Sequence, residues 1–141
     1  MVSDRPLIAI VDDEAPVRTM LRRALRLADF EVATYANGED FLDSLAAGPP
    51  ACVVLDIHLP GLSGLDAERQ LNTWNVPVPV VLITASDDAT LDSAAAVAGA
   101  VRLLRKPFST EILLDAVREA LAKAAGKVDM EQTSAGGLTK G

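Results

Sequence analysis

Five polar residues stand at the ends of four apolar segments of the chain. Asp12 and Asp13 follow the first segment, Asp56 and Thr84 end two others, and Lys106 lies just beyond a fourth. Clustered carboxylates repel one another unless a hard cation neutralises them, and Mg²⁺ prefers oxygen ligands. If the segments bring these residues together, the pattern predicts a magnesium-binding acidic site with a hydroxyl and an ammonium group beside it.

The apolar segments are expected to be strands of a parallel sheet. The segments that end at Asp56 and Thr84 lack the alternation of a strand exposed on one face, so they are predicted to be buried on both faces. Five strands alternate with five helical segments, which predicts an α/β fold with right-handed crossovers. The predicted strands are residues 7–11, 31–35, 52–56, 80–84 and 101–104. Ligands bind such sheets at the carboxyl ends of the strands, where the polar residues stand.

Length and composition limit the possible functions. With 141 residues, the chain is expected to form one domain at residues 1–125, followed by a flexible tail or truncated linker at residues 126–141. The net charge of −7 argues against unassisted binding to nucleic acid or to an anionic membrane. No segment approaches the roughly 20 apolar residues that span a bilayer. The single cysteine, Cys52, excludes a disulfide framework, so a cytoplasmic location is expected.

The motifs, taken in order, resemble those of the receiver domain of two-component response regulators, a flavodoxin-like phosphoacceptor module. The resemblance covers residues 7–124 and implies a five-stranded parallel sheet of order 2-1-3-4-5 with five helices on both faces. The matching motifs are Val11-Asp12-Asp13, Leu55-Asp56 followed by Pro60 and Gly64, Thr84-Ala85-Ser86, Gly99-Ala100, and Lys106-Pro107-Phe108.

This resemblance implies a role for each acidic residue. Asp56 is similar to the phosphoacceptor, whose carboxylate attacks the phosphorus of a phosphohistidine in a sensor histidine kinase or a histidine phosphotransfer protein. Asp13 matches the direct Mg²⁺ ligand, and Asp12 matches the ligand that acts largely through water. The backbone carbonyl of His58 would complete the protein's share of the ligands, and the ion would bridge carboxylate and phosphoryl oxygens.

Other residues are expected to respond to the phosphoryl group. Lys106 would pair with one phosphoryl oxygen, and the Thr84 hydroxyl would donate to another, which makes Thr84 the expected sensor. The Lys106-Pro107 peptide bond is expected to be cis, as in the family. His58 and Ser86 lie two residues beyond the acceptor and the sensor, respectively. Both are expected to flank the approach of the hydrolytic water and to modulate the lifetime of the phosphorylated state.

The resemblance also implies how the signal leaves the domain. Phosphorylation is expected to alter the face formed by the fourth helix, fifth strand and fifth helix, which would mediate a homodimer or contact an output domain. Leu103 stands where the family often has Tyr or Phe, so aromatic rotamer switching does not carry over. We expect a signalling phosphoacceptor with self-catalysed phosphotransfer and autodephosphorylation, not an enzyme.

Several alternatives remain open. A haloacid-dehalogenase-type phosphatase also forms an aspartyl phosphate, but it needs a second Asp at the position of His58. A dinucleotide-binding enzyme would need a glycine-rich turn after the first strand, where Asp12 and Asp13 stand. Within the receiver family, the chain is interpreted as the N-terminal part of a transcriptional regulator, and the alternative is a stand-alone regulator or phosphorelay protein.

Overall fold

The sheet has five parallel strands in the order β2-β1-β3-β4-β5. The computed structural model describes residues 5–140, and the surroundings of side chains for residues 5–126. The strands are β1 (Leu7–Val11), β2 (Glu31–Tyr35), β3 (Cys52–Asp56), β4 (Val80–Thr84) and β5 (Arg102–Arg105). The predicted bounds agree, except that β5 begins and ends one residue later than expected. The flavodoxin-like strand order is confirmed.

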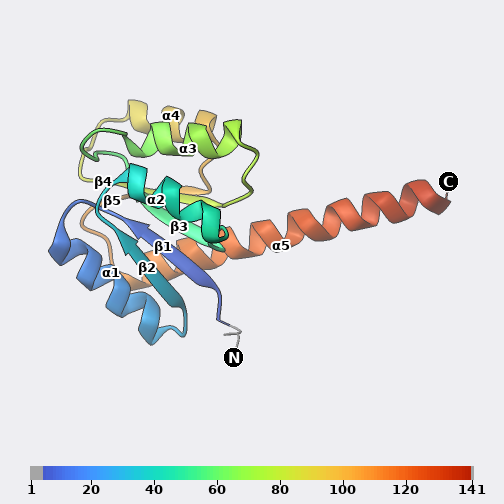
Figure 1. The fold of residues 1–141 in the computed structure, drawn as a ribbon, viewed down its shortest axis with the longest axis horizontal. Helices are drawn as coiled ribbons and strands as arrows, with labels where there is room; N and C mark the ends of the chain where they lie inside the picture. Colours follow the sequence, from blue (N-terminus) through green and yellow to red (C-terminus); the bar gives the residue numbers. More distant parts are fainter. Residues whose placement is uncertain (1–4, 141) are drawn as a thin grey trace.

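Helices connect successive strands and cover both faces of the sheet (Figure 1). They are α1 (Ala15–Leu27), α2 (Gly38–Ser44) with the short 3-10 helix η1 (Leu45–Ala47), α3 (Gly64–Thr73), α4 (Thr90–Ala98) and α5 (Thr110–Lys140). Helices α2, α3 and α5 have N-terminal side-chain caps, because Asn37, Ser63 and Ser109 each accept a hydrogen bond from the N–H three residues later. Gly99 ends α4 with a φ of +91°, which favours glycine.

Alternate strand residues enter two separate cores. Ile8 and Ile10 of β1 pack beneath α1 and α5, whereas Ala9 and Val11 pack beneath α2, α3 and α4. Every residue of β3 and β4 is buried, as the absence of polar alternation predicted. Cys52 belongs to the first core, and burial raises the pKa of its thiol to about 12. These two cores hold the carboxyl ends of β1, β3 and β4 in fixed register.

Helix α5 continues beyond the predicted domain boundary at residue 125. Its backbone runs to Lys140, and its later part extends away from the sheet in Figure 1. Gly126 lowers helix stability by only about 1 kcal/mol relative to Ala, so it does not by itself end the helix. The side chains of residues 127–141 lie outside the described residues, so the tail or linker at residues 126–141 stays a prediction.

Among the helices that the structure describes, none is both long enough and apolar enough to cross a bilayer.

Candidate functional site

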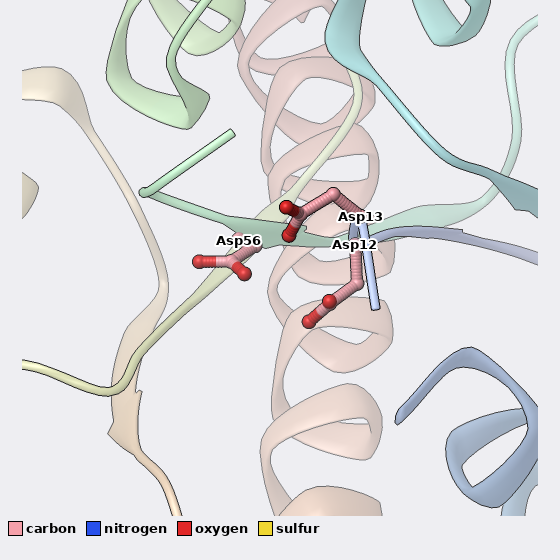
Figure 2. A group of neighbouring side chains, drawn as sticks. All are labelled: Asp12, Asp13 and Asp56. Carbon is pink, nitrogen blue, oxygen red and sulfur yellow. The ribbon is translucent and has the colours of Figure 1, made fainter. Parts of the chain in front are cut away.

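Three carboxylates meet at the carboxyl ends of β1 and β3. The two strands pair in parallel with Val11 opposite Leu55, so the residues that follow, Asp12 and Asp56, are neighbours. Asp12, Asp13 and Asp56 each place a carboxylate oxygen within 4.8 Å of the others (Figure 2). Asp12 and Asp56 are buried, whereas Asp13 is exposed. The acidic cluster predicted from the sequence therefore forms, and Asp13 lies on its solvent side.

Lys106 contacts the two buried carboxylates from the end of β5. Its Nζ lies 2.8 Å from Asp12 Oδ2 and 3.2 Å from Asp56 Oδ2, and its side chain is only 16% exposed. The Lys106 backbone N–H donates to the Thr84 carbonyl at 2.7 Å, which fixes the start of the loop after β5. The Lys106-Pro107 bond is cis, as expected. The ammonium thus offsets part of the carboxylate charge.

The electrostatics of the site follow from burial and from these contacts. Burial raises the pKa of Asp56, and the neighbouring Asp12 charge adds to this, while the His58 backbone N–H and Lys106 oppose it. Burial lowers the pKa of Lys106, but its hydrogen bond to Asp12 and the charge of Asp56 outweigh burial, so the net shift is upward. Lys106 therefore remains an ammonium at neutral pH, and Asp56 is a more basic oxygen nucleophile than an exposed aspartate.

The donor set suits a hard divalent cation. Both Asp12 oxygens already have protein partners, because Oδ1 accepts the Glu14 N–H at 2.9 Å and Oδ2 contacts Lys106. Asp13 has no hydrogen bond or ion pair to another residue within residues 5–126, so its carboxylate oxygens are available to bind a cation directly. Oxygen-only ligands of this kind fit Mg²⁺. The division into a direct ligand, Asp13, and a water-mediated one, Asp12, stays a prediction.

The loop after β3 is held tightly against the acceptor strand. The His58 N–H donates to Asp56 Oδ1 at 3.0 Å, which orients the carboxylate. Gly64 begins α3 so close to this loop that a Cβ there would lie 2.8 Å from the Asp56 carbonyl carbon and 2.9 Å from Ile57 Cα. Only glycine therefore fits at this position without moving the backbone that carries Asp56.

Thr84, Ser86 and His58 form a second group beside the acidic cluster. Thr84 is fully buried at the end of β4. Its Oγ1 accepts the Ser86 N–H at 3.0 Å and lies 2.9 Å from His58 Nε2. The sequence placed His58 and Ser86 on the rim of the site but did not predict that the His58 ring contacts Thr84. The parallel register could have indicated it, because Asp56 pairs with Ile83, which places residues 57 and 84 side by side.

A sequence model of the response regulator receiver domain matches residues 8–118 of the chain. The chain belongs to the response regulator receiver domain family. The family match supports the predicted receiver domain over the phosphatase and dinucleotide-binding alternatives. The domain is that of two-component signalling proteins.

Relatives of the receiver domain include longer proteins. Nodulation protein W of Bradyrhizobium diazoefficiens is 33% identical over 94% of this chain and 59% of its own length. The transcriptional regulatory protein TdiR of Thauera aromatica is 36% identical over 82% of this chain and 51% of its own length. A solved response regulator receiver protein from Burkholderia phymatum is 40% identical, with a TM-score of 0.76 over 84% of this chain and 96% of that structure. The chain thus spans only 51–59% of these two curated relatives.

Two further residues of the receiver domain were missed by the sequence analysis. Arg105 at the end of β5 holds the start of α4, because it bonds to both Asp92 carboxylate oxygens, at 3.1 and 3.2 Å, and to the Asp88 carbonyl at 2.8 Å.

Glu68 of α3 is the second of these residues. Its side chain is 2% exposed, its Oε1 has no hydrogen-bond partner among the described residues, and burial raises its pKa to about 8. Charged residues on a strand or helix are usually solvated, so the sequence alone did not indicate the contacts of Arg105 or the burial of Glu68.

Leu103 occupies the position in β5 that the sequence assigned to it. It pairs with Leu82 of β4 and packs, partly buried, against the core beneath α2, α3 and α4. This position of β5 therefore carries an aliphatic side chain that packs against that core.

Proposed function

We propose that the domain takes a phosphoryl group onto Asp56 from a phosphohistidine of a sensor histidine kinase or a histidine phosphotransfer protein. The observation that supports this most strongly is the position of the Asp56 carboxylate. It ends a buried central strand, lies within 4.8 Å of carboxylate oxygens of Asp12 and Asp13, and accepts a hydrogen bond from Lys106. A nucleophile, a set of cation ligands and a fixed ammonium group are therefore present at one point.

The proposed transfer makes one bond and breaks one. An Asp56 carboxylate oxygen attacks the phosphorus in line with the phosphorus–nitrogen bond, which breaks, and the departing imidazole nitrogen takes up a proton. The product is an acyl phosphate on Asp56. Lys106 stabilises the negative charge that gathers on the phosphoryl oxygens, because its ammonium already stands 3.2 Å from the attacking carboxylate.

A divalent cation fits the same reaction. Bound Mg²⁺ supplies positive charge that screens the carboxylates and the phosphoryl oxygens from one another. In this proposal Asp13 is the direct ligand, Asp12 acts through water, and the backbone carbonyl of His58 and the Asp56 carboxylate complete the protein ligands. Water attack on the acyl phosphate would end the signal, and the side chains of His58 and Ser86 are proposed to modulate that step.

The output of the domain is proposed to lie in the face formed by α4, β5 and α5. Thr84 ends β4 and Arg105 joins β5 to the start of α4, so movement of Thr84 towards a phosphoryl group would be transmitted to this face. We propose that the face forms a homodimer or contacts an output domain.

Because TdiR is named a transcriptional regulatory protein, we propose that this chain is the receiver part of such a regulator. The alternative is a stand-alone regulator or phosphorelay protein. DNA binding would belong to another domain, and the setting is proposed to be cytoplasmic.

Intact-mass spectrometry with acetyl phosphate as donor tests the proposed acceptor function. The wild-type protein should gain one phosphate with Mg²⁺ and none after chelation. Asp56→Asn removes the nucleophile at nearly constant volume and should gain none, whereas Asp66→Asn, an exposed change in α3, should behave as the wild type. A full phosphate on the Asp56→Asn protein would refute the proposal.

A further inference from the structure

The His58 ring and the Thr84 hydroxyl form a contact that the phosphotransfer chemistry alone does not require. His58 Nε2 lies 2.9 Å from Thr84 Oγ1, although the residues follow different strands. His58 is also fixed at its backbone, where its N–H donates to Asp56 Oδ1. One residue therefore contacts the acceptor through its main chain and the expected sensor through its side chain.

The hydrogen-bond capacity of Thr84 limits what this contact can be. A threonine hydroxyl has one proton to donate, and its oxygen lone pairs can accept. The Ser86 N–H already occupies one lone pair at 3.0 Å. Within residues 5–126 no hydrogen bond joins Thr84 Oγ1 to Asp56 or to the Lys106 ammonium. In a neutral imidazole that carries its proton on Nδ1, Nε2 is a hydrogen-bond acceptor. The His58 ring can therefore accept the one hydrogen bond that the Thr84 hydroxyl can donate.

We propose that the resting domain uses His58 as a latch, in which the Thr84 hydroxyl donates its only proton to His58 Nε2 and is thereby held away from the acceptor site. This proposal rests on the proposed phosphoacceptor function of Asp56. A phosphoryl group on Asp56 competes with His58 for the same proton. His58 is thus a positioning residue that acts through Thr84 and biases the domain towards its resting state.

The surroundings of the two residues suit a bond that can be released. Thr84 is fully buried and held by β4, whereas the His58 side chain is exposed after β3. An exposed ring can rotate into water without opening the core. The latch should therefore be weak, and its loss should strengthen binding of a phosphoryl mimic by about threefold to tenfold, as expected for one hydrogen bond.

Beryllofluoride binding measured by calorimetry, with Mg²⁺ in excess, tests the latch in solution. His58→Phe keeps a ring but has no acceptor and should bind the mimic about threefold to tenfold more tightly than wild type. His58→Gln keeps an acceptor at similar reach and should remain close to wild type. In a Thr84→Val background, the His58→Phe change should have no further effect, because the partner hydroxyl is gone. Equal affinities of wild type and His58→Phe, or a persisting His58→Phe effect in the Thr84→Val background, would overturn the latch.

The resting bond has a readout that needs no phosphoryl group. His58 is the only histidine of the chain, so the imidazole nitrogen signals in an NMR spectrum report on it alone. At a pH where imidazole is neutral, wild type should show a protonated Nδ1 and an accepting Nε2, and Thr84→Val should lose this preference. A protonated Nε2 in resting wild type would overturn the latch.

Wild type that neither binds the mimic nor gains a phosphate would overturn the proposed function and the latch with it. Normal phosphate gain with an unchanged His58→Phe affinity for the mimic would overturn the latch alone.

Discussion

Lys106 Nζ and Asp56 Oδ2 lie 3.2 Å apart although 50 positions separate the two residues in the chain. The parallel topology causes this approach, because β5 and β3 flank β4 and all three end at the same edge of the sheet. The pair is largely buried, with 16% of the Lys106 side chain and 5% of the Asp56 side chain exposed. Removal of one partner should therefore leave a buried charge uncompensated.

Lys106→Met should lower the free energy of unfolding by about 3 kcal/mol at pH 8 without Mg²⁺. The loss should be smaller at pH 5 than at pH 8, because burial raises the pKa of Asp56 and protonation of this carboxylate would relieve its repulsion with Asp12. Urea unfolding followed by circular dichroism at both pH values measures it. Lys123→Met is the matched control, because Lys123 is 62% exposed in its ion pair with Glu119 and its loss should change stability little. Equal effects of the two substitutions would contradict the buried-pair account.

Glu68 should make stability fall as pH rises. Its pKa is raised from 4.5 to about 8 by burial, so the folded state holds a proton that the unfolded chain releases. The stability it contributes is present below pH 4.5 and is lost as pH rises towards 8, by roughly 2 to 4 kcal/mol.

Glu68→Gln removes this titration, so the variant should lose less stability than wild type between pH 5 and pH 8. The difference between the two urea-unfolding curves isolates Glu68, because all other titrating groups are shared. Asp66→Asn, at an exposed position of the same helix, should follow wild type. Parallel pH profiles for wild type and Glu68→Gln would show that Glu68 ionises in the fold without cost.

Asp13 and Asp12 should differ in their effect on Mg²⁺ binding. Asp13→Ala removes a carboxylate that has no protein partner among the described residues, whereas Asp12→Ala removes one whose oxygens are already bonded to Glu14 and Lys106. Calorimetric titration should show a loss of affinity for Asp13→Ala that exceeds the roughly tenfold loss expected for a ligand acting through water. Equal losses in the two variants would reverse the assignment of direct and water-mediated ligands.

Arg105 should control the docking of α4. Arg105→Ala removes the bonds to Asp92 and Asp88, so hydrogen exchange of residues 90–98 should become faster in the resting domain, with little change in global stability. Arg102→Ala, on the same strand, breaks a pair with Glu119 of α5 and serves as the control. Unchanged exchange in α4 after loss of Arg105 would mean that apolar packing alone holds this helix.

The sequence predicted the strands and the acidic cluster because both depend on local or pairwise rules. Apolar runs without polar alternation indicated buried parallel strands, and their polar last residues indicated one edge. The proximity of Asp12, Asp56 and Lys106 could then be predicted, because their strands end at the same edge of the sheet.

The remaining features depend on tertiary packing. Whether a given side chain reaches a neighbour depends on rotamer and burial, so the burial of Glu68 had no sequence signal. Only the strand register, which places residues 57 and 84 side by side, indicates the His58 contact with Thr84. The continuation of the α5 backbone past Gly126 likewise had no sequence signal, because a single glycine costs a helix only about 1 kcal/mol.

The chemical identity of the phosphorylated residue is the measurement that tests the central claim most directly. After phosphorylation by acetyl phosphate with Mg²⁺, borohydride reduces an aspartyl phosphate to homoserine, which peptide mass spectrometry can locate. We predict conversion at position 56 alone, lost in Asp56→Asn and absent when Mg²⁺ is chelated. Conversion at position 12 or 13, or a phosphate retained on a residue that borohydride does not reduce, would contradict the assignment of Asp56 as the acceptor.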